Sequence, residues 1–209
     1  MKKQEKEVPQ SLLPRGFAGR VTFVFMNMGH KSIYENVAKV LKLEPEDDLI
    51  EVACGNGYFL NKYASHVRST AGIDLSELAT KLANKNNKGR VAAKTAEFVR
   101  GDASQLPWED GRFSAATSMG SFPGLSKPLD TLKEIHRVLR PKGRVVVSIE
   151  WNAEDGNNHS KASRKYGYRI WSEGEVREML REAGFSDISI AYAKGLMMPK
   201  MMMACGVKP

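Results

Sequence analysis

The sequence predicts an α/β protein built on a doubly wound, mostly parallel β-sheet. Residues 48–64 have the pattern of a buried strand, a glycine turn and a helix, and strand patterns alternate with helix patterns from residue 69 to residue 149. The last two strand patterns, 188–192 and 201–207, are joined by a segment too short for a crossover helix. Alternating elements require parallel strands with right-handed crossovers, and the short final connection requires one antiparallel strand.

The first strand and its turn carry the clearest functional signal. Residues 49–53 form an apolar run broken only by Glu51, as expected for a strand buried on both faces of a sheet. The run enters Gly55-Asn56-Gly57, where glycines permit a tight turn and a close approach to a ligand. A helix over residues 58–64 would direct its free N–H groups to the same place. This arrangement predicts a nucleotide site at the carboxyl edge of the sheet.

Two residues indicate which nucleotide derivative fits. A dinucleotide fingerprint needs a third small residue where this chain has Leu60, so a dehydrogenase ranks last. Glu51 would repel a pyrophosphate but attract an amine or a sulfonium cation. The stretch resembles motif I of the class I S-adenosylmethionine (SAM) methyltransferases, Asp/Glu-x-Gly-x-Gly-x-Gly. Ala53 replaces the first glycine, and a negative φ at this position would accommodate its methyl group.

The remaining elements follow in order. Residues 1–14 are expected to form a loose tail, and the apolar run 21–26 precedes a helix over 32–43 that Ser32 would cap. Further strands are predicted over residues 69–74, 96–100, 112–118 and 144–149. Helices are predicted over residues 76–88, 128–140 and 172–183, the first capped by Ser76 and the last by Ser172 with Glu175.

The resemblance extends over residues 45–209 and implies a Rossmann-like, seven-stranded sheet with an antiparallel last strand. The apolar run 21–26 has no place in that sheet, so residues 17–43 are predicted to form an N-terminal helical lid, the alternative being a helix packed on the flank of the sheet. Asp74 ends the second strand about 20 residues after the glycine turn, where an acid holds ribose hydroxyls. Asp102 matches the acid that accepts from the adenine amine. Residues 106–113 and 134–143 are similar to stretches of the ubiquinone/menaquinone-biosynthesis-like methyltransferases. The SAM-binding residues implied are Glu51, Ala53, Gly55, Asn56, Gly57, Asp74, Leu75, Asp102, Ala103, Ser118 and Met119.

Composition excludes several classes of protein. With 209 residues, 42% hydrophobic and 27% charged, the chain suits one globular domain with a sizeable core. No apolar run approaches the ~18 residues of a membrane helix, and no signal segment follows the charged start. Two cysteines, Cys54 and Cys205, predict a reducing cytoplasm, and the lack of a His-Glu-x-x-His or cysteine cluster predicts no metal. The net charge of +8 is mixed with 24 acids and predicts a diffuse basic surface.

The sequence identifies no catalytic base. His30 and His159 are better placed to face a substrate than His66 or His136, although a structural role is the default for each. An acceptor pocket could be lined by Tyr34, Trp151, Tyr166 and Tyr168, for which packing is also the default. Cys54 is expected to be a small buried side chain.

The function that these features predict is methyl transfer from SAM to a small-molecule acceptor, with S-adenosylhomocysteine as product. One alternative is a nucleic-acid (RNA) methyltransferase, which the sequence Ser118-Met119-Gly120-Ser121-Phe122 disfavours because it lacks an Asn/Asp-Pro-Pro-Tyr/Phe motif. Another is a non-catalytic SAM- or nucleotide-binding module. Residues 1–43 are expected to form a tail and lid, and residues 44–209 the SAM-binding domain of a monomer or homodimer.

Overall fold

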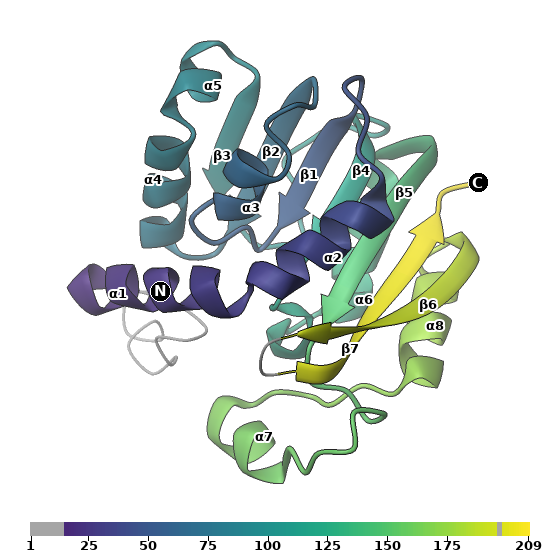
Figure 1. The fold of residues 1–209 in the computed structure, drawn as a ribbon. Helices are drawn as coiled ribbons and strands as arrows, with labels where there is room; N and C mark the ends of the chain where they lie inside the picture. Colours follow the sequence, from purple (N-terminus) through teal and green to yellow (C-terminus); the bar gives the residue numbers. More distant parts are fainter. Residues whose placement is uncertain (1–14, 196–197) are drawn as a thin grey trace.

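Within residues 15–195 and 198–209, which the computed structural model describes, seven strands form one sheet in the order β3-β2-β1-β4-β5-β7-β6 (Figure 1). β1 pairs in parallel with β2 and β4, and β7 is antiparallel to both of its neighbours. The strands are β1 (Asp48–Val52), β2 (Ser69–Asp74), β3 (Ala96–Arg100), β4 (Phe113–Ser118), β5 (Leu139–Ile149), β6 (Ser186–Gly195) and β7 (Met198–Val207). The predicted doubly wound sheet with an antiparallel last strand is confirmed.

Helices cover both faces of this sheet. The helices are α1 (Gly16–Gly29), α2 (Lys31–Leu41), α3 (Tyr58–Lys62), α4 (Glu77–Asn86), α5 (Lys88–Ala92), the 3₁₀ turn η2 (Phe122–Gly124), α6 (Pro128–Val138), α7 (Ser160–Tyr166) and α8 (Glu173–Glu182). α2, α3 and α4 bury apolar side chains on one face, and α6 and α8 bury theirs on the other. The segments that follow the strands therefore meet at the carboxyl edge of the sheet, between the two helix layers.

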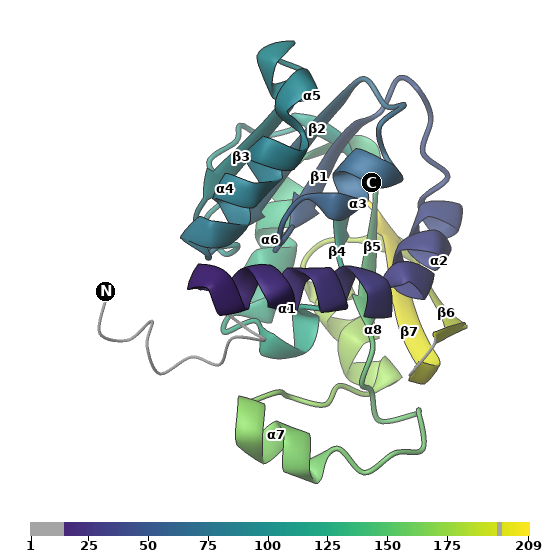
Figure 2. The ribbon, with the colours of Figure 1, turned by 60° about the vertical axis from the view of Figure 1, so that its left-hand side comes forward.

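The order of the strands fixes where a ligand can bind. From β1 the chain moves outward through β2 to β3, and it then returns to β4 on the opposite side of β1. The connections after β1 and β4 therefore diverge, which opens a crevice at the carboxyl ends of these two strands. Figures 1 and 2 both show α1 lying across this edge of the sheet.

Several local predictions need correction. Ser32 lies inside α2 rather than at its N-cap, which is His30, because α1 continues almost directly into α2 and leaves no free helix start. β5 begins at Leu139, five residues before the predicted start, since the chain pairs with β4 from Phe113 onward. The short helices α5 and α7 were not predicted. The predicted tail, residues 1–14, lies outside the described residues.

Two predicted helix starts are confirmed by their capping bonds. The Ala79 N–H donates to Ser76 Oγ (3.2 Å) at the start of α4. At α8, Ser172 and Glu175 form a complete capping box in which the side chain of each accepts from the backbone N–H of the other. The sequence predicts these caps correctly because each capping bond joins residues three apart in the chain.

Candidate active site

The glycine turn after β1 has a backbone that few side chains tolerate. Gly55 and Gly57 have φ values of +53° and +67°. A Cβ on Gly57 would lie 2.8 Å from Asn87 Nδ2 and 3.0 Å from the Ala83 methyl, so this glycine is required by space as well as by φ. Ala53 has a φ of +56°, so the negative φ that would accommodate its methyl group without strain is not found. An alanine in this region carries a strain of about 1 kcal/mol.

These conformations predict opposite effects of two substitutions on stability. Gly57→Ala should lower the free energy of unfolding by about 1–3 kcal/mol, because it adds left-handed strain and overpacking. Ala53→Gly should raise it by up to about 1 kcal/mol, because it relieves strain at a half-buried site. Urea unfolding measures both, with Gly89→Ala as the control, since nothing lies within 4 Å of that Cβ position. Destabilisation by Ala53→Gly would contradict the strain at residue 53.

Two carboxylates stand beside this turn. Asp74, at the end of β2, accepts from the Gly55 N–H and the Ser76 N–H, each at 2.8 Å and each through a different oxygen. Glu51 is buried at 3% exposure in β1, and its Oε2 has no partner among the described residues. Burial, with the charge of Asp74 as a second cause, raises the pKa of Glu51 well above its usual range. Burial also raises the pKa of Asp74, against the two backbone bonds.

A cleft of about 350 Å³ opens next to Asp74, over the ends of β1, β2 and β3. It is lined by Ala53, Ile73, Asp74, Leu75, Gly101, Asp102, Ala103, Gly124, Leu125 and Ser126. Leu75 is 57% exposed there and offers an apolar surface. Asp102 Oδ1 accepts from the Ser104 N–H (2.9 Å), which fixes its carboxylate at the cleft. The cleft therefore combines acids with a flat apolar wall.

Five of the eleven predicted SAM-binding residues line this cleft: Ala53, Asp74, Leu75, Asp102 and Ala103. Glu51 and the turn residues Gly55, Asn56 and Gly57 are not among its lining residues. Residues 124–126 line the cleft as well but follow β4 by several positions, and the sequence held no signal for them. Ser118 and Met119 do not line it. Ser118 is fully buried and its Oγ contacts Ser121 Oγ at 2.9 Å, and Met119 packs in the core.

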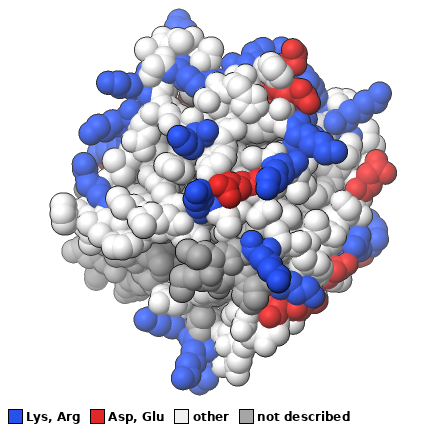
Figure 3. All heavy atoms as spheres, viewed as in Figure 1, with Lys and Arg blue, Asp and Glu red and all other residues white. Residues whose placement is uncertain are grey.

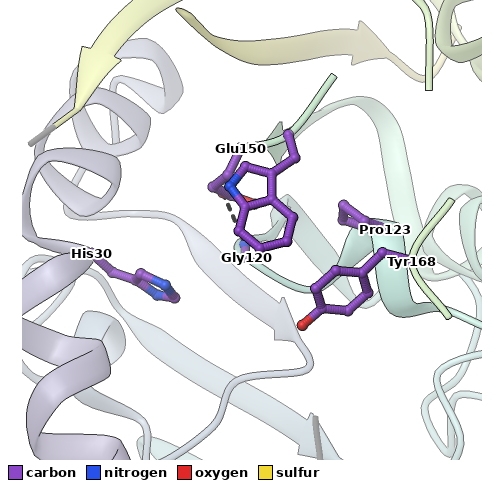
Figure 4. A pocket seen from close by; sticks show the side chains of 6 residues that line it. His30, Gly120, Pro123, Glu150 and Tyr168 are labelled. Carbon is purple, nitrogen blue, oxygen red and sulfur yellow. Dashed lines mark hydrogen bonds between the residues drawn. The ribbon is translucent and has the colours of Figure 1, made fainter. Parts of the chain in front are cut away.

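A second, smaller cavity of about 110 Å³ lies past the ends of β4 and β5. It is lined by His30, Gly120, Pro123, Glu150, Trp151 and Tyr168. His30, Trp151 and Tyr168 were among the predicted candidates, whereas Glu150 was missed. The sequence held one signal for Glu150, which is an acid directly after the β-branched strand that ends at Ile149. Figure 4 shows His30 and Tyr168 on opposite sides of Gly120 and Glu150.

The other candidates take structural positions. Tyr34 is buried against the rings of Tyr58, Phe59 and Tyr63, the last at 5.8 Å. His159 stacks on Trp151 at 5.5 Å and its Nε2 bonds Asp155 Oδ2 at 2.7 Å. His136 packs against Phe185, and the buried Cys54 has a raised pKa because of its burial, so it is an unreactive core side chain. Tyr166 lies against Tyr168 at 5.6 Å.

The charged side chains of this protein do not gather at one place on the face in Figure 3. On the face in Figure 3, lysines and arginines are scattered among acidic and uncharged atoms. Among residues 15–195 and 198–209, no cluster of three or more histidines, cysteines or acids could hold a metal. No helix in this part of the chain has both the length and the apolar character to cross a membrane.

Part of this chain is similar to known methyltransferases. A methyltransferase domain family matches residues 50–147. The chain is 25% identical to a 24-methylenesterol C-methyltransferase of Arabidopsis thaliana and 30% identical to a demethylmenaquinone methyltransferase of Staphylococcus saprophyticus. These alignments cover 84% and 56% of this chain, but only 57% and 50% of the two relatives. The chain thus spans about half the length of these relatives.

A solved structure supports the fold. The putative methyltransferase in a complex with the Trm112 activator of Haloferax volcanii superposes with a TM-score of 0.77 at 21% identity. The match covers 88% of this chain and 91% of that protein. With its motif I turn, its strand order and these similarities, the chain is similar to the class I SAM-dependent methyltransferases, and in particular to their ubiquinone/menaquinone-biosynthesis-like group.

Proposed function

We propose that this protein transfers a methyl group from SAM to a small-molecule acceptor. The observation that carries the proposal is the buried Glu51 carboxylate beside the glycine turn, whose Oε2 has no partner among the described residues. A buried carboxylate without a donor is costly, so its retention points to a ligand that supplies one. The methionine ammonium of SAM would do so, directly or through water.

The other predicted residues fit the remaining parts of SAM. An ionised carboxylate offers about four acceptor sites, and the Asp74 carboxylate uses two of them for backbone N–H groups. Its remaining sites can accept from ribose hydroxyls. Leu75 and Ala103 would contact the faces of adenine, and Asp102 would accept from its exocyclic amine. Gly55, Asn56 and Gly57 would contact the methionine end. Ser118 and Met119, which are buried, would support the methionine end from below without lining the cleft.

SAM, when bound, supplies a methyl group on a positively charged sulfur. The residues of this chain would hold the acceptor in line with that methyl group and exclude water, and positioning alone can supply about 7–11 kcal/mol of the barrier. The named relatives methylate sterols or quinones, which supports a small organic acceptor here. The surface charge scattered over the face in Figure 3 gives no support to a nucleic-acid substrate. A cytoplasmic location and the oligomeric state stay predictions.

We also propose that α1 is a lid over this site. Phe23 of α1 is buried, and its ring would lie 3.2 Å from a Cβ on Gly55. His30, at the end of the same helix, approaches Gly120 in the loop after β4. One helix therefore covers the turns after both β1 and β4, which is where closure would exclude water from the reaction.

Asp74→Ala tests the cofactor assignment. We expect SAM affinity to fall about tenfold, because charge-assisted hydrogen bonds to the ribose are lost. Calorimetry with SAM measures this, and Asp74→Asn serves as the conservative variant that keeps one acceptor oxygen. NADH should not compete with SAM. Unchanged SAM affinity in a folded Asp74→Ala protein, or micromolar NADH binding, would overturn the assignment.

A further inference from the structure

The cavity past β4 and β5 has a different chemistry from the cleft that we assign to SAM. Three of its walls are aromatic rings, from His30, Trp151 and Tyr168. Trp151 is held edge-on to Tyr168 at 5.5 Å, and His159 stacks on it at the same distance, so the ring is fixed from two sides. Among the described residues that line this cavity, none is a lysine or an arginine.

Glu150 is the one carboxylate among those lining residues, and its hydrogen bonds leave one oxygen for a ligand. Oε1 accepts from Ser148 Oγ at 2.6 Å and from the Gly120 N–H at 3.1 Å. Oε2 takes part in neither bond. The side chain is therefore oriented by two donors through one oxygen, as a group that handles a proton should be. Burial raises the pKa of Glu150 to about 7, so both protonation states are accessible near neutral pH.

The cavity is adjacent to the methionine end of the assigned SAM site. Gly120, which holds Glu150, follows Ser118 and Met119 directly in the chain. The charges of Glu51 and Glu150 both raise the pKa of Tyr34, so the two carboxylates act on the same phenol. A group in this cavity would thus lie beside the part of SAM that carries the methyl group.

We propose that Glu150 is the general base of the reaction and that the cavity binds a flat, uncharged acceptor with an acidic hydroxyl group. The inference rests on the proposed methyl transfer. Aromatic walls favour a flat ring, and a lining carboxylate with no lysine or arginine among the described lining residues disfavours an anion. Burial lowers the pKa of His30, which makes it the weaker base of the two.

The step balances with SAM as the methyl donor. The acceptor O–H bond breaks and its proton goes to Glu150 Oε2, while the oxygen electron pair forms a bond to the methyl carbon. The sulfur–methyl bond breaks, its electron pair stays on sulfur, and S-adenosylhomocysteine leaves as a neutral thioether. Glu150 then returns the proton to water.

Glu150→Gln tests the base with 1-naphthol as the probe, because glutamine keeps the oxygen that accepts from Ser148 and Gly120. We expect SAM affinity to be unchanged and kcat for 1-naphthol to fall about 100-fold or more, with KM changed less than threefold. The wild-type kcat should rise with pH through about 7, and this limb should vanish in the variant. Glu109→Gln, an exposed acid remote from the cavity, is the matched control.

The other titratable groups near Glu150 are His30, Tyr34 and Tyr168, so His30→Asn is measured in parallel. If His30→Asn removes the pH limb and Glu150→Gln keeps it, the assignment of the base is wrong. Bound 1-naphthol that the wild type leaves unmethylated would overturn it as well.

A binding measurement tests the acceptor class without turnover. In the presence of S-adenosylhomocysteine, the wild type should bind 1-naphthol at least tenfold more tightly than naphthalene-1-carboxylate, and Glu150→Gln should reduce this ratio below threefold. Equal binding of the two probes by the wild type overturns the proposed acceptor class. Failure of the wild type to bind SAM refutes the proposed function itself, whereas SAM binding with full activity of Glu150→Gln refutes only this inference.

Discussion

Glu51→Gln is expected to weaken SAM binding by about 10- to 100-fold and to stabilise the ligand-free protein at neutral and alkaline pH. A hydrogen bond to a charged group contributes about 1.5–3 kcal/mol, which corresponds to this loss of affinity. The ligand-free protein gains because the variant has no buried charge to desolvate. Glu51 is thus expected to lower the stability of the ligand-free protein and to strengthen SAM binding.

The stability difference between Glu51→Gln and the wild type should depend on pH. The pKa of Glu51 is raised in the folded protein, so its contribution to stability is full below the unfolded pKa and is lost as pH rises through the folded pKa. The difference in Tm between Glu51→Gln and wild type should therefore grow from pH 5 to pH 9. Glu150, whose pKa is also raised, is common to both proteins and cancels in this difference.

Thermal unfolding across this pH range and calorimetry with SAM measure the two effects, with Glu109→Gln as a control for the loss of an acid. If Glu51→Gln bound SAM as tightly as the wild type, Glu51 would not contact the ammonium. A Tm difference that stayed constant with pH would mean that Glu51 does not titrate in this range.

Phe23→Ala should cost about 3 kcal/mol of the free energy that docks α1, at the low end for a buried phenylalanine. SAM affinity should fall about tenfold, equal to ~1.4 kcal/mol, and methyl transfer should fall with it. The reason is that the Phe23 ring covers the Gly55 turn, so its loss admits water to the site.

Phe25→Ala is the matched control on the same helix, because Phe25 is 68% exposed whereas Phe23 is 4% exposed. Calorimetry and stopped-flow dissociation of SAM compare the two variants, and Phe25→Ala should behave as the wild type in both. A Phe23→Ala protein that is less stable but binds and releases SAM normally would make α1 a packing helix on the flank of the sheet.

The sequence alone determined the fold and several of the residues that line the first cleft. Patterns that depend on neighbours in the chain sufficed for this: the apolar run into Gly55, the capping residues Ser76 and Ser172, and the acid that ends β2. Parallel strands bring their carboxyl ends to one edge, so Asp74 and Asp102 could be assigned to one cleft without coordinates. Which ligand they bind remains a prediction.

Only the tertiary structure decided the conformation of Ala53 and the setting of Glu150. The φ of Ala53 depends on how the turn packs, and no local pattern encodes a left-handed alanine. Glu150 follows a strand like many surface acids, but it is buried and shares a cavity with His30 and Tyr168, which lie far from it in the chain. Contacts between distant segments set burial, and burial sets the pKa, so the second cavity could be described only after the chain was folded.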